Sequence, residues 1–448
     1  MHRIIRLIKK LLRKSRTKHQ PIDANYVIPR SKHPISKTDI SANALKVLNR
    51  LNSEGFEAYL VGGSVRDLLL HKSPKDFDVA TNATPNQVRN LFRNARIIGR
   101  RFKLVHVLFH REIIEVATFR GSEAAETNQL TNERGMLVRD NAYGTLEEDA
   151  WRRDFTINSL YYNINDFSIV DFTGGVQDIA LKTLRMIGDP LTRYQEDPVR
   201  MLRAIRFSAK LHFQIAKETA EPIKEHASLI THVSNSRLFD EITKLYQCGE
   251  GKQVQTLLNT YGVFPYLFPQ TARLFESTYP AKILLEIALE STDTRIHSNK
   301  PVTPAFLFAV ILWFPMLAAA ERLKQQGVDP LPAIEQAMSM VIAEQNKIIS
   351  IPKRFSQVVR EIWIMQYRFP KRTGNRAMQL LEHPRFRAAY DFLALRALAG
   401  DESIALAQWW DSFQEADTKT QYDMITEVSE TAPTNKKPRK KRTKKPVS

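Results

Sequence analysis

Cysteine is almost absent from this sequence, because Cys248 is the only one among 448 residues. A single thiol excludes an intramolecular disulfide and a cysteine-based zinc site, since each needs more than one cysteine. Chains without disulfides are typical of reducing compartments. We therefore interpret Cys248 as a structural residue and expect a cytoplasmic protein.

Long apolar runs are missing as well. The longest, FLFAVILWFP at 306–315, is well short of the roughly 20 residues that span a bilayer. We expect this run to form a buried core helix, and we expect no transmembrane segment. With 43% hydrophobic and 25% charged residues, the composition is that of a globular protein, and the length allows about two to four domains.

Acidic residues are too few to balance the basic ones. Lys and Arg number 66 against 48 Asp and Glu, which gives a net charge of +18. An excess of this size favours a polyanionic partner, such as nucleic acid or an anionic membrane surface.

Both ends of the chain are basic. The N-terminal MHRIIRLIKKLLRKSR places its apolar residues on one helical face, which is typical of a helix on a membrane or on RNA, or of a poorly ordered leader. The sequence leaves these alternatives open. The C-terminal NKKPRKKRTKKPVS at 435–448 is a run of like charge broken by proline and predicts a disordered tail. The tail either binds RNA phosphates or is only solvated, and the basic composition favours RNA.

Between the two ends, the sequence pattern changes once. From about 58 to 187, short apolar runs alternate with helical patches, which predicts an α+β or α/β layer. After residue 189 the strand signals nearly vanish and helical periodicity continues, punctuated by proline. We therefore expect a mixed head followed by a long all-helical part.

A glycine pair follows one of the apolar runs. The run EAYLV leads into Gly62 and Gly63, where the backbone can approach a ligand closely. Ser64 would begin a helix, with Asp67 three residues later completing a capping-box pattern. A glycine turn at a helix N-terminus presents free N–H groups to a phosphate, and Arg66 would add guanidinium donors. Taken alone, the same pattern is more typical of simple tight packing.

Two aspartates come soon after the glycine pair. Alternation along a strand puts Asp76 and Asp78 on one face, and Phe77 and Val79 on the other, where they can be buried. Neighbouring carboxylates repel unless a cation lies between them, and Mg²⁺ binds carboxylates together with water and substrate phosphates. An isolated pair would be typical of a turn or a solvated edge, but beside a phosphate cradle it predicts a magnesium site.

Four motifs, in order along the chain, resemble those of the nucleotidyltransferase superfamily that includes DNA polymerase β. The specific resemblance is to its branch of tRNA CCA-adding enzymes and bacterial poly(A) polymerases, over about 36–250. The motifs are GGSVRD at 62–67 followed by DFD at 76–78, RRDFTIN at 152–158, DFTGGVQD at 171–178 and EDPVRMLR at 196–203. In that branch they are the catalytic signature and the ribose-recognising, hinge and base-recognising motifs.

The resemblance implies an α+β fold with several regions. A nucleotidyltransferase head with a small mixed β-sheet and helices would precede all-helical neck, body and leg regions. The expected boundaries are a basic amphipathic, flexible leader at 1–35, the catalytic head at 36–187, a base-recognising neck at 188–260, a body and C-terminal RNA-binding region at 261–430 and a disordered basic tail at 431–448.

The same resemblance implies the site residues. Asp76 and Asp78 would hold two Mg²⁺ ions and ATP would be the substrate. Asp154 and Glu115 are both expected among the catalytic residues, with Asp154 as the essential one. Asp154 would ligate metal or contact the ribose, or would only cap the helix that follows, and Glu115 is a polar residue in the apolar strand IIEVATF. The sequence does not decide which of the two reaches the metal. The nucleotide-binding residues implied are Gly62, Gly63, Ser64, Arg66, Arg152, Arg153, Asn158, Asp197, Arg200 and Arg203.

The base-recognising motif opens a helix with two distinct faces. Asp197 suits the cap and Pro198 the first helical position. Helical projection puts Arg200, Arg203 and Phe207 on one side and aliphatic residues on the other. We expect the first face to offer guanidinium donors and an aromatic plane to a base. An acidic acceptor near Asp197 with an arginine donor could read the Watson–Crick edge of adenine without a template.

The implied activity is template-independent addition of AMP from ATP to RNA 3′ ends, as in mRNA polyadenylation that marks RNA for processing or decay. The alternatives are CCA addition to tRNA and a catalytically silent RNA-binding protein. The segment 351–391 and the basic tail resemble bacterial poly(A) polymerases, and no phosphohydrolase His-Asp pair is evident in the helical part, which favours poly(A) addition.

Further expected partners are RNA-decay machinery and, through the N-terminal helix, the membrane periphery. We expect a monomer.

Overall fold

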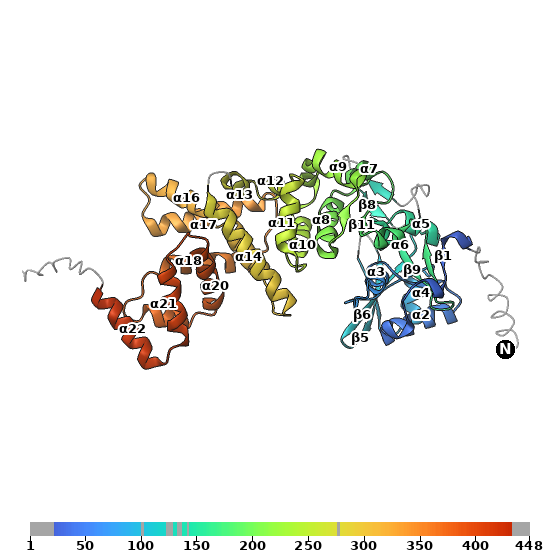
Figure 1. Ribbon diagram of the computed structural model, residues 1–448, viewed down its shortest axis with the longest axis horizontal. Helices are drawn as coiled ribbons and strands as arrows, with labels where there is room; N and C mark the ends of the chain where they lie inside the picture. Colours follow the sequence, from blue (N-terminus) through green and yellow to red (C-terminus); the bar gives the residue numbers. More distant parts are fainter. Residues whose placement is uncertain are drawn as a thin grey trace, which may run out of the picture. The chain divides into compact units, whose positions relative to one another are not determined.

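The computed structural model describes residues 22–99, 103–121, 129–131, 137–140, 143–275 and 278–431. The chain divides into two compact units, Met1–Val233 with Thr256–Val263, and Ser234–Gln255 with Phe264–Ser448. Figure 1 colours the first unit mainly blue to green and the second mainly yellow to red. The expected N-terminal helix and basic tail lie outside the described residues.

An eight-stranded sheet forms the centre of the first unit, in the order β1-β10-β9-β2-β3-β6-β5-β4. Its strands are β1 (Val27–Ile28), β2 (Ala58–Val61), β3 (Asp78–Thr81), β4 (Ala95–Ile98), β5 (Leu104–Phe109), β6 (Glu112–Thr118), β9 (Leu160–Tyr162) and β10 (Ile169–Asp171). Neighbouring strands are antiparallel except β3 and β6, which are parallel. The sheet is therefore mixed, as predicted.

Two small strand pairs accompany the main sheet. β7 (Gln129–Thr131) pairs antiparallel with β8 (Leu137–Asp140). β11 (Thr183–Leu184) pairs parallel with β12 (Gln214–Ile215), so it joins the segment after the hinge motif to the segment after the base-recognising helix.

Helices cover the sheet and continue the first unit. α2 (Ala42–Ser53) buries Ala44, Val47, Leu48 and Leu51, which recur at helical spacing, against β2, β3 and β6. The other helical segments of this part are η1 (Ala24–Tyr26), η2 (Arg30–Lys32), η3 (Lys37–Asp39), α3 (Gly63–Leu69), α4 (Pro85–Leu91), α5 (Leu146–Trp151), η4 (Thr156–Asn158), α6 (Gly175–Ala180), α7 (Pro190–Glu196), α8 (Val199–Leu211), α9 (Lys217–Glu225), η5 (Ala227–His232) and the end of α11 (Gly251–Thr260). The first residues of α11, up to Gln255, belong to the second unit.

The sheet begins earlier in the chain than expected. Val27 and Ile28, inside the segment expected to be a flexible leader, form β1 and pair with β10 at one edge of the sheet. Tyr26 packs on Phe172 with ring centroids 5.1 Å apart. Two apolar residues beside an aromatic contact are enough to dock this short strand, so the expectation of a leader extending to residue 35 is wrong for residues 27–28.

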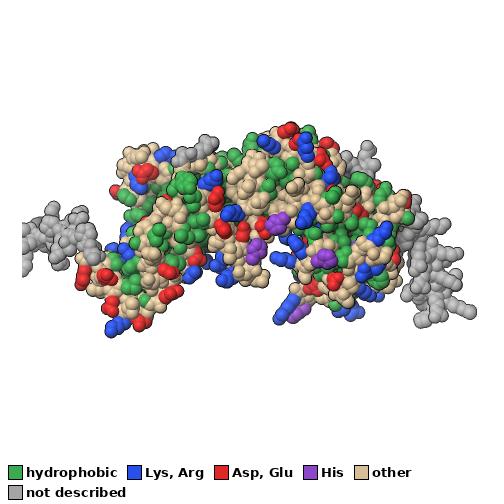
Figure 2. Space-filling view, in the orientation of Figure 1, with side chains coloured by type: hydrophobic (Ala, Val, Ile, Leu, Met, Phe, Trp, Pro, Cys, Tyr) green, Lys and Arg blue, Asp and Glu red, His purple; other side chains and the backbone are tan. Residues whose placement is uncertain are grey.

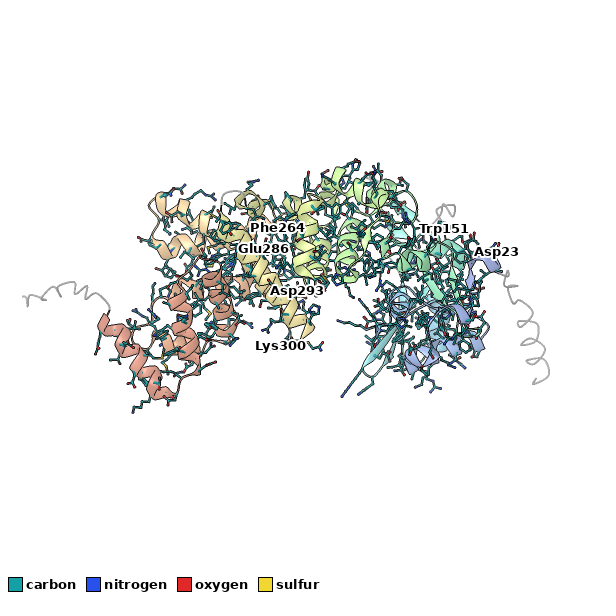
Figure 3. The ribbon with its side chains drawn as sticks, in the orientation of Figure 1. Asp23, Trp151, Phe264, Glu286, Asp293 and Lys300 are labelled. Atoms are coloured by element: carbon teal, nitrogen blue, oxygen red, sulfur yellow. The ribbon has the colours of Figure 1, made fainter. Side chains whose placement is uncertain are left out.

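The second unit is helical throughout its described residues, which confirms the predicted fold class. Its helices are α10 (Asn235–Tyr246), α12 (Phe264–Leu267), α13 (Pro269–Leu274), α14 (Tyr279–His297), α15 (Pro304–Ile311), α16 (Trp313–Gln325), α17 (Pro330–Asn346), α18 (Lys353–Arg368), α19 (Arg376–Leu381), α20 (Phe386–Leu398), α21 (Ile404–Glu415) and α22 (Thr418–Thr431). Figure 3 labels Glu286 and Asp293 along α14 and Lys300 just beyond its end. The Asp293 carboxylate accepts from the backbone N–H groups of Gly251 and Lys252 at 2.7 and 3.1 Å and so caps α11.

The longest apolar run lies in the core of this unit, as predicted. It forms α15, whose Leu307, Phe308 and Val310 are buried, and the start of α16. The indole N–H of buried Trp363 donates to the carbonyl of Ala309 at 2.9 Å. Among the described helices, none alone has the length and apolar character needed to cross a bilayer, although the bent pair α15–α16 reaches both when taken together.

Candidate active site

The glycine pair forms the turn between β2 and α3. Gly62 is the N-cap residue and has a φ of +74°, a backbone conformation that side-chain-bearing residues rarely adopt. The helix begins at Gly63. The Ser64 hydroxyl donates to the carbonyl of Val61 at 3.1 Å, and no side chain caps the helix. The capping box expected from Ser64 and Asp67 is therefore wrong, because the turn already places Ser64 within the first helical turn.

Arg66 points into the protein. It is 3% exposed, and its Nε and Nη2 donate to Asp67 Oδ1 at 2.9 and 2.7 Å. Its Nη1 donates to Asn158 Oδ1. The guanidinium thus ties α3 to η4, the short helix of the ribose-recognising motif. These hydrogen bonds let Arg66 and Asn158 position the glycine turn, and the nucleotide contacts expected of both residues stay predictions.

The aspartate pair alternates as predicted. Asp78 is the first residue of β3, and Asp76 lies just before the strand. Phe77 and Val79 are buried, whereas Asp76 is exposed and Asp78 partly exposed. Across the antiparallel pairing with β2, Asp78 lies opposite Val61, the residue that precedes the glycine turn. The sheet therefore brings the aspartate and the turn together.

Glu115 lies beside Asp78 on the neighbouring strand. The two residues are partners in the parallel pairing of β3 with β6. Burial raises the pKa of Asp78 to about 6; the charges of Glu115 and Asp76 add to the rise and Arg153 opposes it. A carboxyl group in such surroundings favours a proton or a cation.

The open face of the sheet continues from Glu115 to His106. Glu115 alternates with buried Ile114 and Val116, and its side chain is 50% exposed. This alternation explains a glutamate in an apolar run. His106 lies opposite Glu115 on β5, with Nε2 and Oε1 3.2 Å apart. Acidic side chains thus reach solvent on the face that carries Asp78.

The carboxylates fit a magnesium ion by donor type. Among the described residues, no three His, Cys, Asp or Glu side chains are already arranged to hold an ion. Mg²⁺ usually takes only one or two carboxylates from the protein and completes its shell with water and substrate phosphates. Two mutually repelling carboxylates, Asp78 and Glu115, meet that requirement.

Asp154 makes its contacts within the protein. Arg203 donates to Oδ2 from Nε at 2.7 Å, and the Phe155 N–H and Asn158 Nδ2 donate to Oδ1 at 2.8 and 3.3 Å. Burial alone would raise the pKa of Asp154, but Arg203 and these hydrogen bonds outweigh it and lower the pKa. Because both oxygens have protein partners, the geometry favours Glu115 as the third carboxylate.

Arg153 lies behind the glycine turn. Its Nε donates to the Tyr161 hydroxyl at 2.8 Å and its Nη2 donates to Asp149 at 3.0 Å. Its Nη1 reaches the carbonyl of Asn158 at 3.5 Å. A Cβ atom placed on Gly62 would lie 3.5 Å from this Nη1. Arg153 therefore supports the turn from within the protein, and the nucleotide contact expected of it stays a prediction.

Arg152 lies among other arginines. Burial lowers its pKa to about 9, and the positive charges of Arg120, Arg193, Arg200 and Arg153 lower it further. A guanidinium pKa falls this far only where burial and like charges outweigh the nearby acids. The cluster is therefore a region of positive potential that an anionic ligand would relieve. Arg120 and Arg193 were not among the residues predicted from sequence.

Arg193 joins the base-recognising and ribose-recognising motifs. Its Nη2 donates to the carbonyls of Arg152 and Arg153, and its Nη1 donates to Glu196 Oε2 at 2.9 Å. Arg200 Nη1 donates to the same Glu196 oxygen and to the Arg193 carbonyl, both at 2.7 Å. The i,i+3 spacing of Arg193 and Glu196 was the sequence signal that could have revealed this link.

The start of α8 differs slightly from the prediction. The helix begins at Val199 with Pro198 as its N-cap residue. The Asp197 carboxylate accepts from the Val199 N–H at 3.3 Å. Asp197 therefore lies at the start of the helix, as expected. It lies two residues before the first helical residue, whereas the sequence predicted that it would directly precede that residue.

Phe207 does not present its ring to a ligand. It is 8% exposed and packs edge-to-face on Phe155, with ring centroids 5.9 Å apart. The guanidinium carbons of Arg66, Arg203 and Arg206 lie 5.3, 5.3 and 4.8 Å from its ring centroid. The expected aromatic plane for a base is thus wrong, because the helix packs this ring among arginines. Phe207 supports those arginines instead.

Comparison with known proteins assigns named regions to the chain. Residues 58–185 match a model described as the poly A polymerase head domain. Residues 212–275 match one described as a probable RNA and SrmB-binding site of polymerase A, and residues 326–445 match the arginine-rich C-terminus of polymerase A.

Solved structures with the same fold are tRNA enzymes. The Thermotoga maritima CCA-adding enzyme complexed with tRNA has a TM-score of 0.57 and 18% identity, with 87% of each chain covered. A structure described as a tRNA-processing enzyme, apo form 2, has a TM-score of 0.56 and 20% identity, covering 85% of this chain and 99% of the other. At this identity the likeness shows the fold alone.

Sequence relatives resolve the family. Poly(A) polymerase I of Escherichia coli O6:H1 is 51% identical over 94% of this chain and 92% of its own length. The enzyme of the same name from Haemophilus influenzae is 46% identical over 93% and 95%. The CCA-adding enzyme of Bacillus subtilis is 40% identical, but over only 48% of this chain and 53% of its own. Similarity along nearly the whole length, with the head and arginine-rich regions in place, shows that the chain belongs to the poly(A) polymerase I family of nucleotidyltransferase enzymes.

Proposed function

We propose that the chain transfers AMP from ATP to the 3′-hydroxyl of RNA without a template, releases pyrophosphate and so builds polyadenylate tails. The observation that carries this proposal is the pairing of Asp78 with Glu115 next to the Gly62 turn, in a chain of this family. Phosphoryl transfer needs positioning and charge neutralisation more than covalent help, and acidic side chains beside a glycine turn suit that need.

The proposal includes two Mg²⁺ ions, with Asp76 and Asp78 as ligands and Glu115 as the further carboxylate. When bound, such ions neutralise triphosphate charge and lower the pKa of the attacking hydroxyl. The raised pKa of Asp78, about 6, supports this set because a cation would relieve the repulsion from its neighbours. Asp154 is proposed to hold Arg203 in place.

The nucleotide is proposed to use backbone and side-chain donors of the same unit. The N–H groups of Gly63 and Ser64 would bind phosphate at the start of α3. Arg152, with its arginine neighbours, would bind the negative charge of the triphosphate, which its lowered pKa supports. Asp197 and Arg200 would read the adenine edge by one acceptor and one donor.

RNA is the proposed polymeric substrate, and most of the attraction for it would come from the chain ends. Residues 1–21 and 432–448 carry eight Lys or Arg residues each and no Asp or Glu. These two ends therefore hold most of the net charge of +18 of the whole chain. Figure 2 shows basic and acidic side chains interspersed on the visible face of the described residues. Contact with RNA-decay machinery, a peripheral membrane contact through the N-terminal segment, a cytoplasmic location and a monomeric state remain part of the proposal.

A nucleotide-incorporation assay tests the proposed reaction. Purified protein is incubated with unstructured RNA, Mg²⁺ and each nucleoside triphosphate separately, and products are resolved by length. Long tails with ATP alone support poly(A) addition. Addition that stops at CCA on tRNA ends would support the alternative activity, and binding without incorporation would contradict both. Asp76→Ala should abolish incorporation while RNA binding persists.

A truncation tests the role of the tail. Removing 435–448 takes away eight basic residues. Because phosphate contacts release counterions, the truncated chain should bind RNA more weakly and with a shallower dependence on salt. An unchanged salt slope would remove the tail from the RNA-binding proposal.

A further inference from the structure

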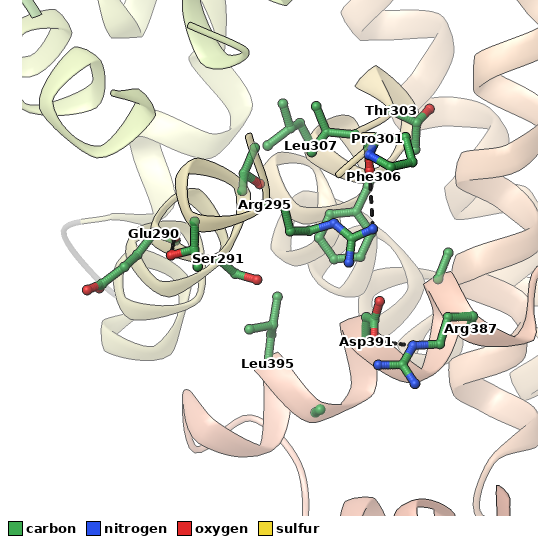
Figure 4. Close-up of a pocket in the computed structure, with 15 residues that line it drawn as sticks. Glu290, Ser291, Arg295, Pro301, Thr303, Phe306, Leu307, Arg387, Asp391 and Leu395 are labelled. Carbon is green, nitrogen blue, oxygen red and sulfur yellow. Dashed lines mark hydrogen bonds and ion pairs between the residues drawn. The ribbon is translucent and has the colours of Figure 1, made fainter. Parts of the chain in front are cut away.

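A pocket of about 460 Å³ lies within the second unit, lined by residues of α14, α15 and α20 and of the segment before α15. Figure 4 shows its lining side chains. This volume is within the range of small-molecule sites, roughly 300–1,000 Å³. α20 falls inside the region that matches the arginine-rich C-terminus of polymerase A.

The walls of the pocket are mainly apolar. Phe306 and Leu307 come from α15 and Leu395 comes from α20. The Phe306 ring packs against Phe392 with centroids 6.2 Å apart and an interplanar angle of 84°, which fixes the orientation of the ring. A flat apolar ligand could therefore lie against an already ordered aromatic side chain.

Polar groups enter the same pocket from two helices. Asp391 accepts from Arg387 Nε at 3.0 Å, and Arg295 donates to the carbonyl of Pro301 at 3.2 Å. In Figure 4 the Arg295 and Asp391 side chains enter the pocket from α14 and α20. Burial raises the pKa of Asp391, while Arg387 and Arg295 limit the rise. The Asp391 carboxylate can thus accept a hydrogen bond in the pocket and the Arg295 guanidinium can donate one, while Glu290 and Arg387 also line the pocket.

We propose that this pocket binds an adenine base, supplied by polyadenylate RNA or by a free adenine nucleotide. The base would stack on Phe306, its exocyclic amine would donate to Asp391, and a ring nitrogen would accept from Arg295. Arg387 lines the pocket and its side chain is 71% exposed, so it would meet a phosphate at the rim. Uracil carries a carbonyl where adenine carries its amine, so it would repel Asp391.

The inference rests on the proposed function, since the reaction makes an all-adenine strand. A site in the second unit that holds bases already added would keep the growing tail bound between additions. The pocket would then favour substrates that already end in adenylate over other RNA ends. It would not be needed for the first addition to an RNA without such a tail.

Equilibrium binding tests the pocket apart from catalysis. Fluorescence anisotropy of the full chain, without ATP or Mg²⁺, would compare labelled oligoadenylate with oligouridylate. Asp391→Leu removes both carboxylate oxygens at similar volume, and Thr294→Trp, at an exposed lining position, fills the mouth without touching the core. Asp423→Leu, at an exposed position of α22, is the matched control. Thermal unfolding of each variant reports whether it is folded.

Both pocket variants should weaken oligoadenylate binding by about 5- to 10-fold and leave oligouridylate binding unchanged. If AMP displaces labelled oligoadenylate from the wild type but not from the variants, free nucleotide is a ligand of the pocket. If the variants lose affinity for oligoadenylate and AMP does not compete in the wild type, the ligand is RNA. Equal weakening for both oligonucleotides, or no weakening in a folded variant, would overturn the proposal.

Incorporation measurements separate this inference from the proposed function. Asp391→Leu should retain first-step AMP addition to an RNA that lacks an adenylate tail and should show a raised KM for tailed RNA. If the wild-type chain incorporated no AMP but bound oligoadenylate selectively through the pocket, the proposed function would fail and the base site would stand. If the wild-type chain incorporated AMP but bound both oligonucleotides equally, the proposed function would stand and the base site would fail.

Discussion

Asp78 lies directly opposite Glu115 in the parallel pairing that joins β3 to β6. Opposed residues on neighbouring strands project to the same face, so two carboxyl groups share one environment. Burial and the charge of Glu115 together raise the pKa of Asp78 to about 6. This relationship explains why a glutamate occupies an otherwise apolar strand, and it is the observation on which the proposal of Glu115 as the further carboxylate rests.

Replacing Glu115 should impair catalysis without unfolding the protein. Glu115→Gln keeps the shape of a half-exposed side chain but removes a charge, so we expect AMP incorporation to fall by about 10- to 100-fold. The melting temperature should change little. Glu112→Gln is the control, since Glu112 lies on the same strand but pairs with Asn43 through a 2.7 Å hydrogen bond. Equal losses in both variants would indicate a general defect of β6.

Asp154 should behave differently from Glu115. Asp154→Asn removes the charge from a partly buried ion pair with Arg203, and the loss of a hydrogen bond to a charged group typically costs about 1.5–3 kcal/mol. We therefore expect a marked fall in the free energy of unfolding, measured by urea titration, as well as lower activity. A variant of unchanged stability but abolished activity would show that Asp154 acts directly in the reaction, and the assignment to Glu115 would need revision.

Magnesium should stabilise the first unit through the same carboxylates. A ligand that binds only the folded state at 100 times its Kd adds about 2.7 kcal/mol. At a pH above 6, where Asp78 is ionised, Mg²⁺ should therefore raise the melting temperature by several degrees. Asp78→Asn should remove most of that increase. An increase that persists in the variant would place the ion elsewhere.

The two glycines of the turn should respond differently to alanine. Gly62 has a φ of +74°, so Gly62→Ala introduces strain of about 1–2 kcal/mol even though the nearest atoms would be 3.5 Å or more from the new Cβ. Gly63 has no positive φ, and its Cβ would meet only the Arg66 guanidinium, with Nη2 at 3.5 Å and Nη1 at 4.0 Å. Gly63→Ala should preserve the unfolding free energy but raise the KM for ATP, because the methyl group would lie against the guanidinium that positions the turn. Equal destabilisation in both variants would refute this distinction.

The fold class followed from local sequence patterns together with the family resemblance. Alternation around Phe77 placed Asp78 on the open face, and the motif order predicted a mixed sheet followed by helices. Strand order and the pairing partner of Asp78 could not be read from one sequence, because parallel pairing joins segments far apart in the chain. Glu115 and Asp154 were therefore left as alternatives.

Side-chain direction was the main limit of prediction. Helical projection correctly placed Phe207 with Arg200 and Arg203, but it could not tell which side of α8 packs against the head. Phe207 is buried against Phe155. In the same way, Arg66 looked like a phosphate donor, but its donors are used within the protein by Asp67 and Asn158. Such contacts depend on tertiary packing rather than on local pattern.

Arg193 should act as a positioning residue. Its guanidinium holds the carbonyls of Arg152 and Arg153 and the Glu196 carboxylate. Arg193→Lys keeps the charge but cannot make this set of planar hydrogen bonds, so kcat/KM for ATP should fall by about 10-fold or more. RNA binding should be unchanged. Arg322→Lys, at an exposed position of α16, is the control, and a similar loss there would show that the effect is not specific.

Asp391 should make the stability of the second unit depend on pH. Burial raises its pKa above the ordinary 3.8, Arg387 and Arg295 limit that rise, and Glu290 also lines the pocket. A carboxyl group with a raised folded-state pKa stabilises the fold fully below its unfolded pKa and loses that contribution as pH rises through the folded value. Asp391→Asn does not titrate. The unfolding free energy of the wild type relative to this variant should therefore decrease between pH 3.8 and neutral pH, as measured by denaturant titration across that range. A difference that stays constant, or grows with pH, would mean that the arginines outweigh burial and that the carboxylate is held in its charged form.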